Sequence, residues 1–135
     1  MKKVVVCKGS FEVDLEIDRG STFRHVLTWK VKDQLAPGET ATEDTYSEVD
    51  LTGCTAEMQI RASQRSSQVL YTLSTTNGTI VLGDLAGTVE IYIPDEDTRD
   101  FDWTIATYGL EVTFANGDVR KLTYGKVSCF DETTR

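Results

Sequence analysis

The stretch DLTGCTAEMQIR, residues 50–61, decides the fold, because its apolar and polar residues alternate almost without error. In an extended chain, one side would carry the mostly apolar set Cys54, Ala56, Met58 and Ile60. The opposite side would carry the polar set Thr55, Glu57, Gln59 and Arg61. A period of two is typical of a β-strand with one buried face. Residues 50–53 have the composition of a turn that leads into this strand.

The same period recurs along most of the chain. Residues 11–18, FEVDLEID, alternate without interruption, and residues 22–32 place Phe23, His25, Leu27, Trp29 and Val31 on one face. Shorter strands are expected near 69–73, 80–82, 88–93, 108–114 and 119–127. About eight or nine short strands with regular turns predict an all-β protein, an antiparallel β-sandwich or a barrel, rather than an α/β domain.

The shared phase of these strands also predicts one buried interior between two sheets. The residues expected there are Phe23, Leu27, Trp29, Met58, Ile60, Leu73, Ile91, Leu110 and Val112.

Turn signals separate the predicted strands. Asn77-Gly78 and Asn116-Gly117 each predict a hairpin. The last strand is less regular, and a bulge is expected near Arg120-Lys121. Residues 95–103, DEDTRDFDW, are the one helix candidate, with one or two turns and Asp95 as the N-cap.

Residues 33–50, DQLAPGETATEDTYSEVD, break the alternation and contain no lysine or arginine. Their acidic side chains include Glu39, Glu43, Asp44, Glu48 and Asp50. We expect an exposed acidic loop, longer than most internal connections, inserted into a single domain of residues 1–135. Residues 34–49 are expected to become ordered where they meet a basic partner surface.

Length and charge limit the classes of partner. A chain of 135 residues with 39% apolar and 27% charged residues fits one soluble domain. No apolar run approaches the ~20 residues of a membrane helix, and Val4–Cys7 is shorter than the ~7–15-residue core of a signal peptide. The formal net charge of −8 disfavours a phosphate backbone as partner. We therefore expect neither nucleic acid nor a membrane as partner.

The three cysteines, Cys7, Cys54 and Cys129, lie far apart in the sequence and form no C-x-x-C pair. This spacing disfavours a zinc ribbon or a thioredoxin-type redox site. Cys54 falls in phase with an apolar strand face. We expect buried free thiols in a protein made in a reducing cytoplasm.

His25 is the only histidine, so any Ser-His-Asp or Cys-His arrangement would have to use it. Its phase with Phe23, Leu27 and Trp29 predicts a packed histidine instead. No G-x-S-x-G sequence is present, and a single histidine leaves no basis for a histidine zinc site. We expect no catalytic residue and no cofactor.

An acidic cluster occupies the helix candidate and comprises Asp95, Glu96, Asp97, Asp100 and Asp102. The cluster lacks the central glycine and the terminal glutamate of an EF-hand loop. Nothing in the sequence marks a carboxylate pair for glycoside hydrolysis. A solvated helical turn is therefore expected here, and no metal site.

Several stretches, taken in order, carry a resemblance to a known family: DRGSTFRHVLTW, DLTGCTAEMQIR, NGTIVLG with GTVEIYI, YGLEVTF and GDVRKLTYGKVSCFDETTR. Together they resemble small virion proteins of tailed bacteriophages and the N-terminal, Ig-like β-sandwich domain of upper baseplate proteins that anchor receptor-binding parts. The resemblance runs from about Phe11 to Arg135 and includes no catalytic motif. The acidic insertion departs from the short loop of that family, so contacts near it are expected to be specific to this protein.

The resemblance implies an Ig-like fold and a non-enzymatic structural role in the virion, at the tail, baseplate, neck or head surface, after assembly in the host cytoplasm. The implied partners are other virion proteins, including copies of this chain. Contacts with them are expected at Val4, Val5, Val6, Glu43, Asp44 and Glu48. Met1–Lys8 either pairs with a neighbouring subunit or forms an edge strand of its own sandwich.

The alternative function is that of a carbohydrate-binding β-sandwich module. This alternative requires Trp29 or Trp103 to be exposed beside convergent polar groups, whereas their phase favours burial in the core.

Overall fold

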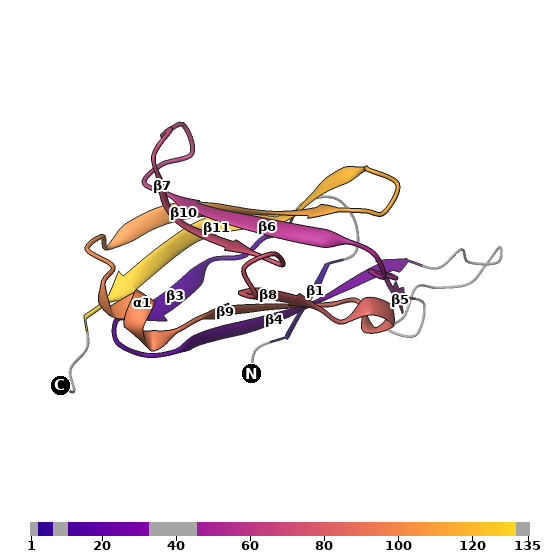
Figure 1. Ribbon diagram of the computed structural model, residues 1–135, viewed down its shortest axis with the longest axis horizontal. Helices are drawn as coiled ribbons and strands as arrows, with labels where there is room; N and C mark the ends of the chain where they lie inside the picture. Colours follow the sequence, from indigo (N-terminus) through magenta and orange to yellow (C-terminus); the bar gives the residue numbers. More distant parts are fainter. Residues whose placement is uncertain (1–2, 7–10, 33–45, 132–135) are drawn as a thin grey trace.

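The computed structural model describes residues 3–6, 11–32 and 46–131. In this part of the chain, eleven strands form two packed sheets, which confirms the predicted all-β sandwich (Figure 1). The strands are β1 (Lys3–Val6), β2 (Phe11–Glu12), β3 (Leu15–Asp18), β4 (Phe23–Lys32), β5 (Tyr46–Glu48), β6 (Thr55–Arg61), β7 (Val69–Ser74), β8 (Ile80–Leu82), β9 (Thr88–Ile93), β10 (Ile105–Thr113) and β11 (Val119–Phe130). A 3-10 helix, η2 (Asp84–Ala86), and a short helix, α1 (Asp95–Arg99), complete the described elements. The strands outnumber the expected eight or nine for two reasons. Residues 11–18, expected as one strand, form two short strands, β2 and β3, which both pair with β11, and β5 is a short addition to β4.

One sheet has the strand order β1-β4-β9-β8, with β5 also paired to β4. The other has the order β2-β11-β10-β6-β7, with β3 also paired to β11. The described pairs are antiparallel except for β1–β4, β2–β11 and β3–β11. The chain changes sheets after β1, β3, β5, β7 and β9, so consecutive strands are shared between two layers, as in an Ig-like sandwich.

The core lies between the two sheets and is built from alternate residues of each strand. Leu27 and Ile91 come from one sheet, Met58 and Leu110 from the other, and each is at most 1% exposed. The predicted core set is confirmed: its members are buried except for Phe23, which is half-buried and packs against the others. The fold therefore follows from the period of two that the sequence displays.

The bulge expected near Arg120-Lys121 lies one position further along the chain. Leu110 pairs with Thr123, whereas Glu111 pairs with Lys121, so Leu122 is the extra residue. Leu122 and Thr123 are both fully buried. Because of the bulge, two successive side chains of β11 face the core, and the next side chain, Tyr124, again faces outward.

The turn at Asn77-Gly78 is not the hairpin that the sequence predicts. β7 pairs with β6 and β8 pairs with β9, so this turn carries the chain from one sheet to the other. The Asn77 side chain satisfies backbone groups that a hairpin ladder would otherwise pair: its Nδ2 donates to the Thr72 carbonyl (3.2 Å), and its Oδ1 accepts from the Thr79 N–H (3.0 Å). Asn116-Gly117 does close the β10–β11 hairpin, as predicted.

The acidic loop expected over residues 33–50 is wrong at its C-terminal end. Residues 46–48 form β5, which pairs with Lys30–Lys32 of β4, and Val49 packs against the core. β4 is long enough to offer backbone donors and acceptors beyond its pairing with β9, and β5 takes them up. Residues 33–45 lie outside the described residues.

The predicted N-cap of the helix is also wrong. Pro94 occupies the N-cap position of α1, with φ −66° and ψ 152°. The proline ring already holds φ near this value, so no side-chain cap is needed to direct the chain into the helix. Asp95 lies inside the first turn, where its carboxylate is 3.4 Å from the Arg99 guanidinium.

Along one edge of β4, residues 23–28 pair with β9 and residues 30–32 pair with β5, and Trp29 lies between the two pairings. Its N–H donates to the Gly87 carbonyl (2.8 Å), and its carbonyl accepts from the Val49 N–H (2.9 Å). Gly87 has φ 66°, and a Cβ there would be 2.7 Å from the Trp29 carbonyl oxygen. Both the backbone angle and the close approach therefore require glycine.

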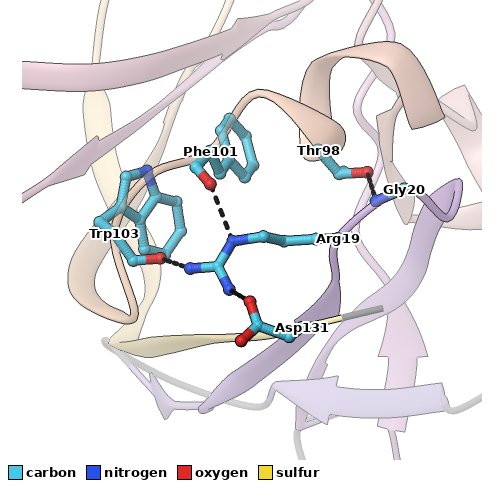
Figure 2. Close-up of polar contacts among 6 residues, drawn as sticks. All are labelled: Arg19, Gly20, Thr98, Phe101, Trp103 and Asp131. Atoms are coloured by element: carbon cyan, nitrogen blue, oxygen red, sulfur yellow. Dashed lines mark hydrogen bonds and ion pairs between the residues drawn. The ribbon is translucent and has the colours of Figure 1, made fainter. Parts of the chain in front are cut away.

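Arg19, in the corner between β3 and β4, joins three distant segments (Figure 2). Its Nε donates to the Phe101 carbonyl (2.8 Å), and its other N–H groups donate to the Trp103 carbonyl and the Asp131 carboxylate. The Arg19 side chain is only 16% exposed. These contacts fasten the corner to the segment after α1 and to the end of β11.

Thr98 of α1 fastens the same corner from the other side. Its buried hydroxyl accepts from the Gly20 N–H (3.1 Å) and donates to the Ser21 carbonyl (2.8 Å). Because both backbone groups lie at the sheet-to-sheet corner, α1 serves to close this end of the sandwich (Figure 2).

Truncation of the core is expected to be costly. Leu27→Ala and Ile60→Ala each remove a side chain that is at most 1% exposed, so each should lower the free energy of unfolding by about 2–5 kcal/mol. Val81→Ala is the control, because Val81 is 56% exposed, and its effect should stay within about 0.5 kcal/mol. Urea denaturation measures all three, and comparable losses in the three variants would contradict a single core containing Leu27 and Ile60.

Replacement of Arg19 tests the corner. Arg19→Ala should cost about 1.5–3 kcal/mol, because it leaves the partly buried carbonyl groups of Phe101 and Trp103 without a charged donor. Arg19→Lys should recover little of this, since an ammonium group cannot reproduce the planar fork of donors. Arg24→Ala is the matched control: that arginine is 52% exposed and pairs with Glu90 at the surface. If thermal unfolding ranks Arg24→Ala as the more damaging change, the role assigned to Arg19 is wrong.

Candidate interaction surface

The residues with catalytic potential take part in packing. His25 is 8% exposed, and its ring stacks on Phe23 with 6.4 Å between centroids, so the predicted packed histidine is confirmed. Cys54 is half-buried and Cys129 is buried, and burial raises the pKa of both thiols. Raised thiol pKa values leave little nucleophilic thiolate at neutral pH. Cys7 lies outside the described residues.

The acidic cluster lies on and after α1, where two of its members have partners within the fold. Asp95 faces Arg99, and Asp97 accepts a hydrogen bond from the Tyr71 hydroxyl (2.6 Å). Burial, with this hydrogen bond and the Asp97 charge, raises the pKa of Tyr71 well above its ordinary value. Within the described ranges, no group of three or more His, Cys, Asp or Glu side chains is placed to hold a metal ion.

The predicted partner residues lie on or beside one strand, in so far as the structure describes them. Val4, Val5 and Val6 belong to β1 and pair in parallel with Leu27, Thr28 and Trp29 of β4. This pairing corresponds to the second of the two alternatives for Met1–Lys8, an edge strand of the chain's own sandwich.

The predicted acidic contacts are described only in part. Glu48 ends β5, and its carboxylate is 3.7 Å from the Lys30 ammonium at the surface. Glu43 and Asp44 lie outside the described residues. The structure therefore brings Val4–Val6 and Glu48 to the same strand, β4, and says nothing about the other two residues.

A groove of about 840 Å³ lies on the outer face of the six-stranded sheet. β10 forms its floor, because the outward residues there, Thr107 and Gly109, are small. The longer side chains of the neighbouring strands form two walls: Glu57, Gln59 and Arg61 from β6, and Lys121, Tyr124 and Lys126 from β11. The groove is therefore a direct product of which residues the alternation turns outward.

The β6 wall is ordered by its own hydrogen bonds. Gln59 donates to the Glu57 carboxylate (2.9 Å), and Arg61 donates to the Gln59 side-chain oxygen (2.6 Å). The Arg61 guanidinium also donates to the Ser66 carbonyl (2.7 Å). These contacts hold three long side chains in place, so less conformational entropy would be lost on binding a ligand.

Charge is sorted along the groove by the strand register. At one end, Glu111 pairs with Glu57 on one side and with Lys121 on the other. At the opposite end, Thr107 lies between Arg61 and Lys126. The first end carries two adjacent carboxylates with one lysine beside them, and the second carries two cations.

The same outer face gathers exposed apolar side chains. Seven large apolar side chains are exposed among the described residues. Strand phase places five of them on this face: Val69, Ile105, Val119, Tyr124 and Phe130. The other two, Val81 and Leu85, belong to the β8–β9 region. Single exposed apolar side chains are ordinary on a protein surface, so it is their concentration on one face that favours an interaction site.

Sequence reasoning missed this surface. Ile105, Tyr124 and Phe130 stand at the outward phase of their strands, and Gly109 interrupts the middle of a strand. Apolar residues at outward positions and a glycine within a strand were the features of the sequence that could have indicated this surface. The groove itself depends on the adjacency of β6, β10 and β11, which a single sequence does not state.

Comparisons with known proteins give little beyond the fold. No protein-family model and no curated protein matches this chain. A solved structure of Drosophila OTK, extracellular domains 3–5, is similar at 13% sequence identity with a TM-score of 0.36, covering 96% of this chain and 34% of that chain. This chain thus spans about a third of the length of that structure. No helix in the described ranges has the length and apolar character needed to cross a membrane.

Proposed function

We propose that this chain is a non-enzymatic structural protein of a tailed-bacteriophage virion, which attaches or bridges other components at the tail, baseplate, neck or head surface. Its partners are other virion proteins, including copies of itself, and it enters the particle during assembly in the host cytoplasm. The sequence resemblance from about Phe11 to Arg135 supports this assignment.

The observation that carries the proposal is the outer face of the six-stranded sheet. A protein that acts by attachment needs a surface whose side chains are not consumed by folding. This face combines a groove with opposite charges at its ends and five exposed apolar side chains. Protein interfaces commonly have this mixed character, with aromatic and arginine side chains among polar ones.

A carbohydrate-binding module is the second candidate, and Tyr124 is the observation in its favour. Its side chain is 41% exposed in the groove, where Gln59 and Glu12 offer polar groups. The tryptophan platform that this candidate required is missing at Trp29, which is 6% exposed and packs on Phe114. Trp103 is half-buried against Phe101. Attachment to protein therefore remains the better-supported function.

Purified particles test the proposal. The chain, carrying a small epitope tag, should co-purify with particles of the phage that encodes it through a density gradient, at a fixed ratio to the major capsid protein. Quantitative mass spectrometry measures the ratio, and antibody labelling in the electron microscope locates the chain. Recovery of the chain only in the particle-free fraction of the lysate would reject a role in the virion.

Deletion of residues 1–8 separates the two roles considered for the first strand. Because β1 pairs with β4 of the same chain, we expect the deletion to expose the β4 edge and to lower stability by about 1–3 kcal/mol. Chemical denaturation measures this loss, and incorporation into particles is measured in parallel. Unchanged stability together with lost incorporation would instead identify the segment as an arm that binds a neighbour.

A further inference from the structure

We propose that the groove over Gly109 is the docking site for an extended segment of a partner protein, and that this segment carries a basic and an acidic residue four positions apart. The inference rests on the proposed attachment function and names the surface that performs it. Three independent features support it: an unexplained glycine, the distribution of charge, and the shape of the groove.

The fold does not require glycine at position 109. A Cβ added there would meet no atom within 4 Å, and Gly109 does not belong to the glycines with positive φ. Gly125, on the neighbouring strand, differs: a Cβ there would be 2.5 Å from the Val13 carbonyl oxygen. Glycine in a strand costs roughly 0.5–1 kcal/mol relative to alanine. Such glycines often mark a place where a ligand or a second backbone approaches closely.

The charge pattern defines the occupant. Glu57 and Glu111 stand directly opposite each other, and Lys121 lies on the other side of Glu111, so this end carries one more negative than positive charge. A basic side chain placed between the two carboxylates would balance this excess negative charge. At the other end, Arg61 and Lys126 flank Thr107 and would pair with a carboxylate. The groove thus fits a ligand with opposite charges at its two ends.

The spacing of the two ends matches an extended peptide. Glu57 and Arg61 are four residues apart on β6, or about 13 Å at the rise of a strand. An extended segment that lies along β10 has the same rise and the same period of two. Its residues i and i+4 therefore point to the same side and reach the two ends of the groove together. Residue i+2, which points to the same side, would rest on Gly109 beside the Tyr124 ring.

These features favour a peptide over an oligosaccharide. A neutral sugar chain would stack on Tyr124 and could accept hydrogen bonds from Gln59, but it would not balance the excess negative charge at the end that holds Glu57, Glu111 and Lys121. A peptide with a basic and an acidic side chain satisfies both ends. Val69, next to Arg61, and Ile105, next along β10, offer further apolar contact beyond the basic end.

A variant that fills the groove without disturbing the fold provides the test. Gly109→Phe places a ring over the floor, and Gly109→Ala adds a single methyl group as its matched control. Because the space above Gly109 is open and glycine weakens a strand relative to alanine, both variants should melt at or above the melting temperature of the parent chain. Selection of random linear displayed peptides is carried out on the parent protein, and each selected peptide is then measured on both variants.

We expect the selected peptides to carry Lys or Arg and Asp or Glu four positions apart. They should bind Gly109→Phe at least about tenfold more weakly than the parent protein, a change of about 1.4 kcal/mol, and bind Gly109→Ala nearly as the parent does. A Glu57→Lys and Glu111→Lys double variant should shift the selection toward peptides with acidic residues in place of the basic one.

Two results would overturn the docking proposal. One is a set of selected peptides that bind Gly109→Phe as well as they bind the parent protein. The other is a failure to select peptides while cellohexaose, used as the neutral oligosaccharide probe, shifts the amide resonances of residues 107–111. Either result leaves the virion role standing if the chain still co-purifies with particles. Absence of the chain from particles rejects that role whatever the peptides do.

Discussion

The mutual burial of the two inner sheet faces is the constraint on which the rest of the structure depends. Leu27 and Ile91 on one sheet and Met58 and Leu110 on the other are almost completely excluded from water. A slip of one residue in any of these strands would turn its apolar set outward and its charged set inward. The register that protects the core therefore also determines which residues line the outer face, so the groove and the interior are two results of one pairing pattern.

Much of this pattern is visible in the sequence, because side-chain alternation is a local property. The core residues Ile60 and Leu110, the hairpin at Asn116-Gly117 and the approximate place of the β11 bulge follow from it. The pairing of strands is not local. Asn77-Gly78 has the residues of a hairpin turn, but turn chemistry does not state which sheet the next strand joins.

The candidate surface could be predicted only in fragments for the same reason. β5, in the other sheet, was missed for that reason too, because it is three residues long and forms where β4 extends beyond β9. Nothing in the sequence alone assigns a role to Gly109 or Tyr124, because that role depends on the pairing of β10 with β11, which places Gly109 opposite Tyr124. The overall charge of −8 likewise conceals a local basic end formed by Arg61 and Lys126.

The place of β11 in the fold has a consequence for synthesis. β3, near the start of the chain, pairs with β11, and Arg19 contacts Asp131, a sequence separation of 112 residues. A ribosome adds about 5–20 residues per second, so the early strands leave the exit tunnel several seconds before their partner exists. Contacts of this range also slow folding, because loop closure must precede them. The six-stranded sheet is thus completed only after β11 emerges from the ribosome. Until then, the apolar faces of the earlier strands are exposed and can be bound by chaperones.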